Sequence, residues 1–493
     1  MIHVPLKSGV SAAALVLVAG AAAADVNARQ VWEAWQAGLD ETEAVTLTTD
    51  AQEVEDARVT LTGARIVIDG ANGDTTLRMD RLELVSQSNG SVTVALPDTI
   101  PVEIVGDDGG RATMELRQTG PALRVSGTPD ALRHDLTADR LVLTADEIVD
   151  EEGTALEGEI RGSFDRLVAS YTPTVGELAG KDYSLAADTF DLLVDVLDAQ
   201  TNDPVVLSAR LDNPTADGTL VWPTGVTDVD LPTALATGLS VRGGYGYDAS
   251  AYIFDIGTDT DRSAGTVSSG PTRQRFEIAE TGVSYEGATE GSQAEIRSSA
   301  LPAPVTLELV SQEITLNMPA APTDTPEPFA LRYVLDGLSL GEEAWALVDP
   351  QGAIPRAPAS LTVDLSGEGR VFDRQTRAGG GAPGVLSSLA VNEVALSVAG
   401  AALDVVGALA FDPETSAGAM AAPMPTGTLT VDATGLNGLI DAVIAAGILP
   451  PDQAMMPRLM LGMFARPVGD DALRSEVEFT EGGGITVNGQ RVR

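Results

Sequence analysis

The residue types that most enzymes use for nucleophilic, thiol or zinc chemistry are scarce in this sequence. The chain has no cysteine and two histidines, and only His134 lies outside the N-terminal segment. A serine nucleophile needs a base, most often histidine, and zinc is held mainly by cysteine and histidine. We therefore expect no catalytic triad, no reactive thiol and no zinc site. His134 is expected to be an ordinary surface residue of a strand or turn.

Carboxylates are abundant, and dense oxygen ligands at short spacing can bind calcium. The densest cluster is Asp255, Asp259 and Asp261, and a weaker one is Asp69-Gly-Ala-Asn-Gly-Asp74. The first cluster lacks the glycine and the closing glutamate of an EF-hand loop. A solvated turn is the simpler interpretation of each cluster, so we predict no metal or cofactor site, with calcium binding as the open alternative.

The charge balance excludes several classes of partner. The chain has 72 Asp and Glu against 30 Lys and Arg, for a formal net charge of −42. Nucleic-acid binding depends on basic residues that neutralise phosphates, and anionic lipid head groups repel an acidic surface. We therefore expect no nucleic-acid partner and a soluble, self-repelling surface.

The first 24 residues have the layout of a secretory signal peptide. Lys7 precedes an apolar run over residues 12–20, and Ala22-Ala-Ala24 supplies a small-residue cleavage site. The run is too short to span a bilayer, and the apolar stretch at 436–449 is interrupted by polar residues and glycines. We predict export to the periplasm with cleavage after Ala24, no transmembrane anchor and no disulfides.

Beyond residue 44 the sequence alternates between apolar and polar residues, as β-strands do. Short alternations such as 140–143 are separated by Asn-Gly and Asp-Gly turn signals, which favour hairpins. The fold class is therefore predicted as mainly β, with long antiparallel meandering or curved sheets and a few docked helices. The expected helices are 31–39 with Asn27 as a candidate cap ahead of it, 231–239, 342–348, 436–448 and 455–464.

Domain boundaries are less marked. We divide the chain into the signal peptide 1–24, a helix and β-meander domain 25–260, and a second β-meander with helices and a C-terminal hairpin 261–493. One continuous sheet is the alternative. A loose similarity between residues 96–104 and 301–309 leaves open whether the two halves are duplicates.

Several motifs together resemble a known family. They are the segment 335–361 with Trp345 and Asp349-Pro-Gln-Gly, the helices around Asp441 and Met460, the end at 484–491, and the start at Asp25. As a set that covers nearly all of the chain after residue 24, they resemble the alphaproteobacterial envelope family called domain of unknown function 2125. That family has no established activity, so the resemblance implies no catalytic residue or cofactor.

A more distant similarity is to AsmA-like envelope proteins, which implies long curved sheets with an apolar groove and a part in lipid handling. We therefore expect an exported, non-enzymatic envelope protein that binds a lipid or another apolar ligand in a sheet groove, or contacts an envelope protein. A structural or protein-interaction module without a ligand is the alternative. A carboxylate hydrolase is a remote alternative. It stays open because spacing in the sequence cannot reveal a pair of acids, but sugar-binding clefts usually need aromatic residues, and these make up only 4% of the chain.

Overall fold

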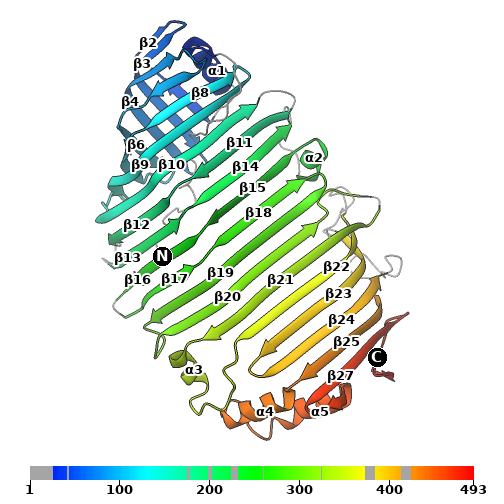
Figure 1. Cartoon of the computed structure of the whole chain (residues 1–493). Coiled ribbons are helices and arrows are strands. Elements are labelled where there is room, and N and C mark those ends of the chain that lie inside the picture. Colours follow the sequence, from blue (N-terminus) through cyan, green and yellow to red (C-terminus); the bar gives the residue numbers. More distant parts are fainter. Residues whose placement is uncertain are drawn as a thin grey trace. The chain divides into compact units, whose positions relative to one another are not determined.

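The computed structural model describes residues 26–40, 44–174, 178–197, 203–223, 231–258, 260–323, 325–371, 384–411 and 424–492. The predicted signal peptide lies outside these ranges. Antiparallel strands dominate and helices are few, which confirms the mainly β class (Figure 1). Contacts group the residues into two compact units. Of the described residues, the first unit contains those up to 223 with those in 243–268 and 298–300, and the second contains those in 231–242, 269–297 and 301–492.

The helices are α1 (Ala28–Asp40), α2 (Leu231–Ala236), α3 (Glu342–Val348), α4 (Leu436–Ala445) and α5 (Met455–Phe464). The bounds predicted for α3 and α5 are confirmed, and the other three expected helices are present with ends that differ by a few residues. In the described ranges, no helix combines the length and the apolar character that crossing a bilayer requires.

The strands before residue 270 are β1 (Val45–Thr48), β2 (Ala51–Val54), β3 (Arg58–Gly70), β4 (Gly73–Ser86), β5 (Val92–Ala95), β6 (Thr99–Gly106), β7 (Arg111–Thr119), β8 (Ala122–Thr128), β9 (Ala131–Val149), β10 (Gly158–Thr174), β11 (Leu178–Ala186), β12 (Thr189–Leu197), β13 (Pro204–Asp212), β14 (Thr215–Pro223), β15 (Ser240–Tyr247), β16 (Ala249–Gly257) and β17 (Arg262–Ser269). Those after it are β18 (Thr272–Ala279), β19 (Gly282–Ser298), β20 (Val305–Met318), β21 (Glu327–Leu340), β22 (Ala359–Val371), β23 (Gly384–Val398), β24 (Ala401–Phe411), β25 (Pro425–Thr434), β26 (Arg466–Gly469), β27 (Ala472–Thr480), β28 (Gly484–Val487) and β29 (Gln490–Arg491).

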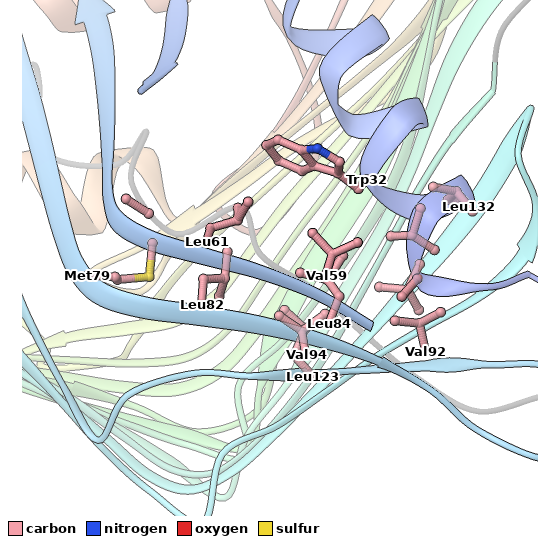
Figure 2. Packing of buried hydrophobic residues seen from close by; sticks show 14 of the residues in the cluster. Trp32, Val59, Leu61, Met79, Leu82, Leu84, Val92, Val94, Leu123 and Leu132 are labelled. Carbon is pink, nitrogen blue, oxygen red and sulfur yellow. The ribbon is translucent and has the colours of Figure 1, made fainter. Parts of the chain in front are cut away.

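In the first unit, α1 covers the apolar side of the N-terminal strands. Asn27 caps the helix, because the Gln30 backbone N–H donates to its Oδ1 at 2.9 Å while the Asn27 N–H donates to the Gln30 side chain. Trp32 then lies over strand residues that are almost fully buried, including Leu61 and Leu84 (Figure 2). This confirms that the N-terminal helix is docked on a core.

Several strands are longer than the predicted ones, because irregular residues interrupt their alternation without ending them. In β3, Gly63 has a φ of 61°, and its neighbours Thr62 and Ala64 pair with Arg81 and Met79 of β4 in an unshifted register. The buried positions change at this point from Val59 and Leu61 to Ala64, so the apolar side chains stay in one core. The glycine tolerates a backbone angle that other residues rarely adopt.

The second unit is a meander in which each strand from β18 to β25 pairs with the next, followed by β27 and β28. Helices α3, α4 and α5 lie at one end of these strands (Figure 1). A small buried cluster of Ile354, Ala399 and Ala446 packs against Trp345 of α3 and Leu439 of α4. Most strand side chains of this unit, by contrast, are only half-buried.

We predict that two leucine substitutions have unequal costs. Leu84→Ala removes a side chain that is 0% exposed and should lower the free energy of unfolding by about 2–5 kcal/mol. Leu331→Ala on β21 removes a half-buried side chain and should cost about 1 kcal/mol. Urea unfolding followed by circular dichroism measures both, and equal costs would contradict this distribution of the core.

Candidate functional site

One face of the second unit is apolar across many strands. The register sets apolar residues opposite one another: Leu331 lies opposite Leu365, and Leu365 lies opposite Val391 on the next strand. This alignment continues from β20 to β27, with glycine or serine at a few positions such as Gly407 and Ser475. We call the following side chains the apolar face: Ile314, Leu316, Phe329, Leu331, Tyr333, Leu335, Leu361, Val363, Leu365, Leu389, Val391, Val394, Leu396, Leu403, Val405, Leu409, Leu429, Val431, Val477 and Phe479.

Bulges keep this face continuous along the strands. Gly337 in β21 has a φ of 69°, and the register with β22 shifts between Leu335 and Leu338. Their partners on β22 are Leu361 and Ala359, which are two residues apart and therefore on the same face. Leu338 thus extends the apolar face instead of crossing to the other side.

The opposite face of the same strands is polar and paired. Arg332 contacts Asp364 at 3.0 Å, and the Asn392 side chain donates to the same carboxylate at 2.8 Å. Arg474 makes two hydrogen bonds to Asp432, at 2.7 and 3.0 Å. The Asn392 hydrogen bond and Arg332 lower the pKa of Asp364, and Arg474 lowers that of Asp432. The sheet therefore separates a charged face from an apolar one.

The apolar face remains accessible to solvent. Of its residues, Val391 is buried, whereas Leu331, Leu365 and Val431 are half-buried and Leu396 is 38% exposed. A sheet inside a two-layer protein would bury these side chains against a second layer. This face is the arrangement in the second unit that can bind an apolar ligand.

His134 in the first unit is buried, so its predicted surface position is wrong. It is 7% exposed, because its ring lies against the rings of Trp35 from α1 and Tyr171 from the neighbouring strand β10. The indole Nε1–H of Trp35 donates to His134 Nε2 at 2.9 Å, and the rings stack at 5.9 Å. His134 Nδ1 lies 3.3 Å from the Tyr171 carbonyl oxygen.

These contacts assign the proton of the imidazole. Because Nε2 accepts from Trp35, the hydrogen sits on Nδ1 and can be donated to Tyr171. Burial lowers the pKa of His134, although the backbone hydrogen bonds oppose the shift. The neutral His134 accepts a hydrogen bond from the indole and thereby links α1 to the sheet. Its hydrogen-bond partners among the described residues include no carboxylate and no serine.

A second apolar feature of the first unit is a depression with aromatic walls. Phe164 and Phe190 have ring centroids 4.8 Å apart, and Tyr245, Tyr247 and Tyr252 complete the walls. Its volume is about 320 Å³, and all its lining residues are uncharged. The tyrosines of the Gly-Tyr alternation in β15 line this open surface, and Tyr245 is 53% exposed.

The two acidic clusters are not assembled as metal sites in the described ranges. Asp255 is occupied by Arg262, which donates to both carboxylate oxygens at 2.6 Å and lowers the pKa of Asp255. Asp259 lies outside the described residues. Asp69 and Asp74 face each other across the β3–β4 hairpin. No group of three His, Asp or Glu side chains among the described residues is placed to hold a metal ion.

A serine motif that sequence reasoning overlooked also takes a structural role. Residues 337–341 read Gly-Leu-Ser-Leu-Gly, the G-x-S-x-G pattern of a hydrolase nucleophile elbow. An elbow places its serine in a strained turn between strand and helix. Ser339 instead lies within β21, directly opposite Glu308, and its φ is not positive.

Asp349, which the family resemblance singled out, closes the loop after α3. Its carboxylate is buried, and its Oδ2 accepts the Ile354 backbone N–H at 2.6 Å. Backbone amides of this loop, Ile354 first, lower its pKa. This carboxylate therefore holds the backbone in place.

We predict that His134 makes folding pH-dependent. The unfolded histidine binds a proton near pH 6.5, whereas the buried one does so only at lower pH. Its contribution is therefore full above that value and is lost as the pH falls through it. His134→Gln should remove this part of the loss measured by urea unfolding between about pH 7.5 and about pH 5.5.

The neighbouring Asp135 also affects how stability depends on pH, but its effect cancels when the wild type and the variant are compared. Burial raises its pKa, which has the opposite effect on stability, and it is present in both proteins. An identical pH dependence of wild type and variant would show that His134 is not held neutral.

The comparisons with known proteins concern the second half of the chain. Residues 255–487 match the family described as an uncharacterized protein conserved in bacteria, DUF2125. The matched range contains the apolar face and helices α3, α4 and α5, but neither α1 nor His134. No curated protein matches the chain, and no solved structure does. Over residues 255–487, which are slightly less than half of the chain, the protein is similar to the DUF2125 family of uncharacterized bacterial proteins.

Proposed function

We propose that this chain is an exported, non-enzymatic protein that binds the acyl chains of lipids on the apolar face of its second unit. One observation carries the proposal: strands β20 to β27 share an apolar face on which nearly every large side chain keeps contact with solvent. Apolar surface left in water costs about 25 cal/mol per Å². Soluble monomers rarely expose contiguous apolar patches above a few hundred Å², and larger ones mark binding sites.

The shape and chemistry of the face favour flexible chains over a compact ligand. Small rigid ligands are usually enclosed in a pocket with a few fixed polar groups. The apolar face is open, and aliphatic residues such as Leu365, Val394 and Val431 dominate it. The ion pair between Arg332 and Asp364 lies on the opposite face of the sheet. An acyl chain needs contact area without specific hydrogen bonds, which is what this face supplies.

The charged groups support a non-enzymatic role. Among the described acids whose pKa is lowered, each contacts arginines, amide groups or backbone N–H groups. Glu83, Glu103, Asp255 and Asp432 have arginine partners, and Asp471 accepts from the start of α4. A carboxylate hydrolase would instead need two acids facing each other across a cleft.

Adjacent residues on β22 provide the test of the binding face. Leu365→Asp places a charge on the apolar face and should lower the amount of radiolabelled palmitate bound per chain about tenfold or more. Ser366→Asp places the same charge on the polar face, where the Asn392 side chain already donates to residue 366 at 3.1 Å. This control should bind palmitate as the wild type does.

Either of two results would contradict the proposal. One is a wild-type chain that binds no palmitate and carries no lipid after purification. The other is equal binding by both variants, provided circular dichroism shows that both are folded. A protein partner that protects the face in place of lipid would favour the interaction-module alternative.

Export is tested separately. If residues 1–24 are a cleaved signal, N-terminal sequencing of the chain from the periplasmic fraction should start at Asp25. A chain that retains Met1 and stays in the cytoplasmic fraction would exclude the exported role.

A further inference from the structure

Helix α5 directs its apolar side chains into solvent. Met455, Met456, Leu459, Met460 and Met463 are 75%, 64%, 58%, 48% and 57% exposed. An α-helix turns once in about 3.6 residues, so these five positions share one side. A surface helix of a soluble protein normally shows polar residues there.

The opposite side of α5 is the one that packs. Ala454 at its start is 3% exposed, and Leu461 and Phe464 are half-buried. Pro457 lies in the first turn, where a missing N–H is tolerated. Both sides of the helix are thus apolar, and packing on its own unit accounts for only one of them.

The segment around α5 also departs from the charge of the whole chain. Residues 453–469 contain no Asp or Glu, although the chain has 72 of them. The only charged residues in the segment are Arg458 and Arg466. Arg458 forms an ion pair with Asp441 of α4. An acid-free apolar surface with arginines beside it suits the boundary between lipid head groups and acyl chains.

We propose that α5 docks the protein on the surface of a lipid bilayer, with its methionine-rich side inserted among the lipids. The unbranched, flexible methionine side chain adapts to irregular surroundings, and such a surface suits a fluid partner. A second copy of the chain is the other candidate occupant. It is disfavoured, because two chains of formal charge −42 repel each other, whereas a zwitterionic bilayer carries no net charge.

This inference goes beyond acyl-chain binding and does not depend on it, because no residue of α5 belongs to the apolar face. Docking would place the second unit at the source or destination of a lipid. The two proposals can fail independently, so the test includes one variant with a charge in α5 and one with a charge on the apolar face.

Vesicle flotation with pure phosphatidylcholine tests the docking. The wild type should float with the vesicles, and Leu459→Asp, at the centre of the exposed side, should reduce the bound fraction about tenfold. Gln453→Asp adds the same charge beside the helix without touching that side, and it should float as the wild type does. Leu365→Asp should also float, because it alters only the apolar face.

Three results would overturn the inference. They are a wild type that stays with the soluble fraction, a Leu459→Asp variant that floats normally, and a wild-type dimer in light scattering that Leu459→Asp dissociates. The last would assign the methionine side to self-association. Circular dichroism and the urea midpoint of Leu459→Asp establish that the variant is folded, and Met460→Asp replaces it if it is not.

Discussion

The antiparallel register of the second unit is the constraint on which its two-sided character depends. A strand slipped by one residue would turn its apolar side chains to the polar face and set Arg332 among leucines. The register prevents this by placing Leu331, Leu365 and Val391 in one row and Arg332 and Asp364 in the next. The bulge at Gly337 preserves the rows where strict alternation would have broken them. The apolar face follows from this pairing.

Both units have an apolar sheet face, which is covered by a helix in the first unit and open in the second. In the first, α1 lies on the strands, so Leu61 and Leu84 are completely buried, and the stacked Trp35 and His134 fasten the end of that helix. In the second, α3, α4 and α5 gather at the ends of the strands (Figure 1), and the middle of the face stays half-buried. This contrast is the physical reason for assigning binding to the second unit. A face that its own helices do not bury is available to another molecule.

Much of the fold could be predicted from local sequence. Alternation and Asn-Gly turns predict the antiparallel strands, and the Asp349-Pro350 and Met455–Phe464 patterns delimit α3 and α5. Strand lengths could not be predicted, since Gly63 and Gly337 interrupt the alternation within continuous strands. The burial of His134 could not be predicted either, because it depends on Trp35, 99 residues away. The open face is equally hidden, since a strand in a two-layer sandwich has the same alternation as one with a free face.

Photo-crosslinking from adjacent residues of β23 would test the central claim most directly. A benzophenone amino acid at Val394 lies on the apolar face, and one at Ala395 lies on the polar face beside Thr362. Irradiation in cells, followed by mass spectrometry of the purified chain, identifies what each position touches. Our account predicts lipid adducts from position 394 and none from position 395. Equal labelling of the two positions, or protein adducts alone from position 394, would contradict it.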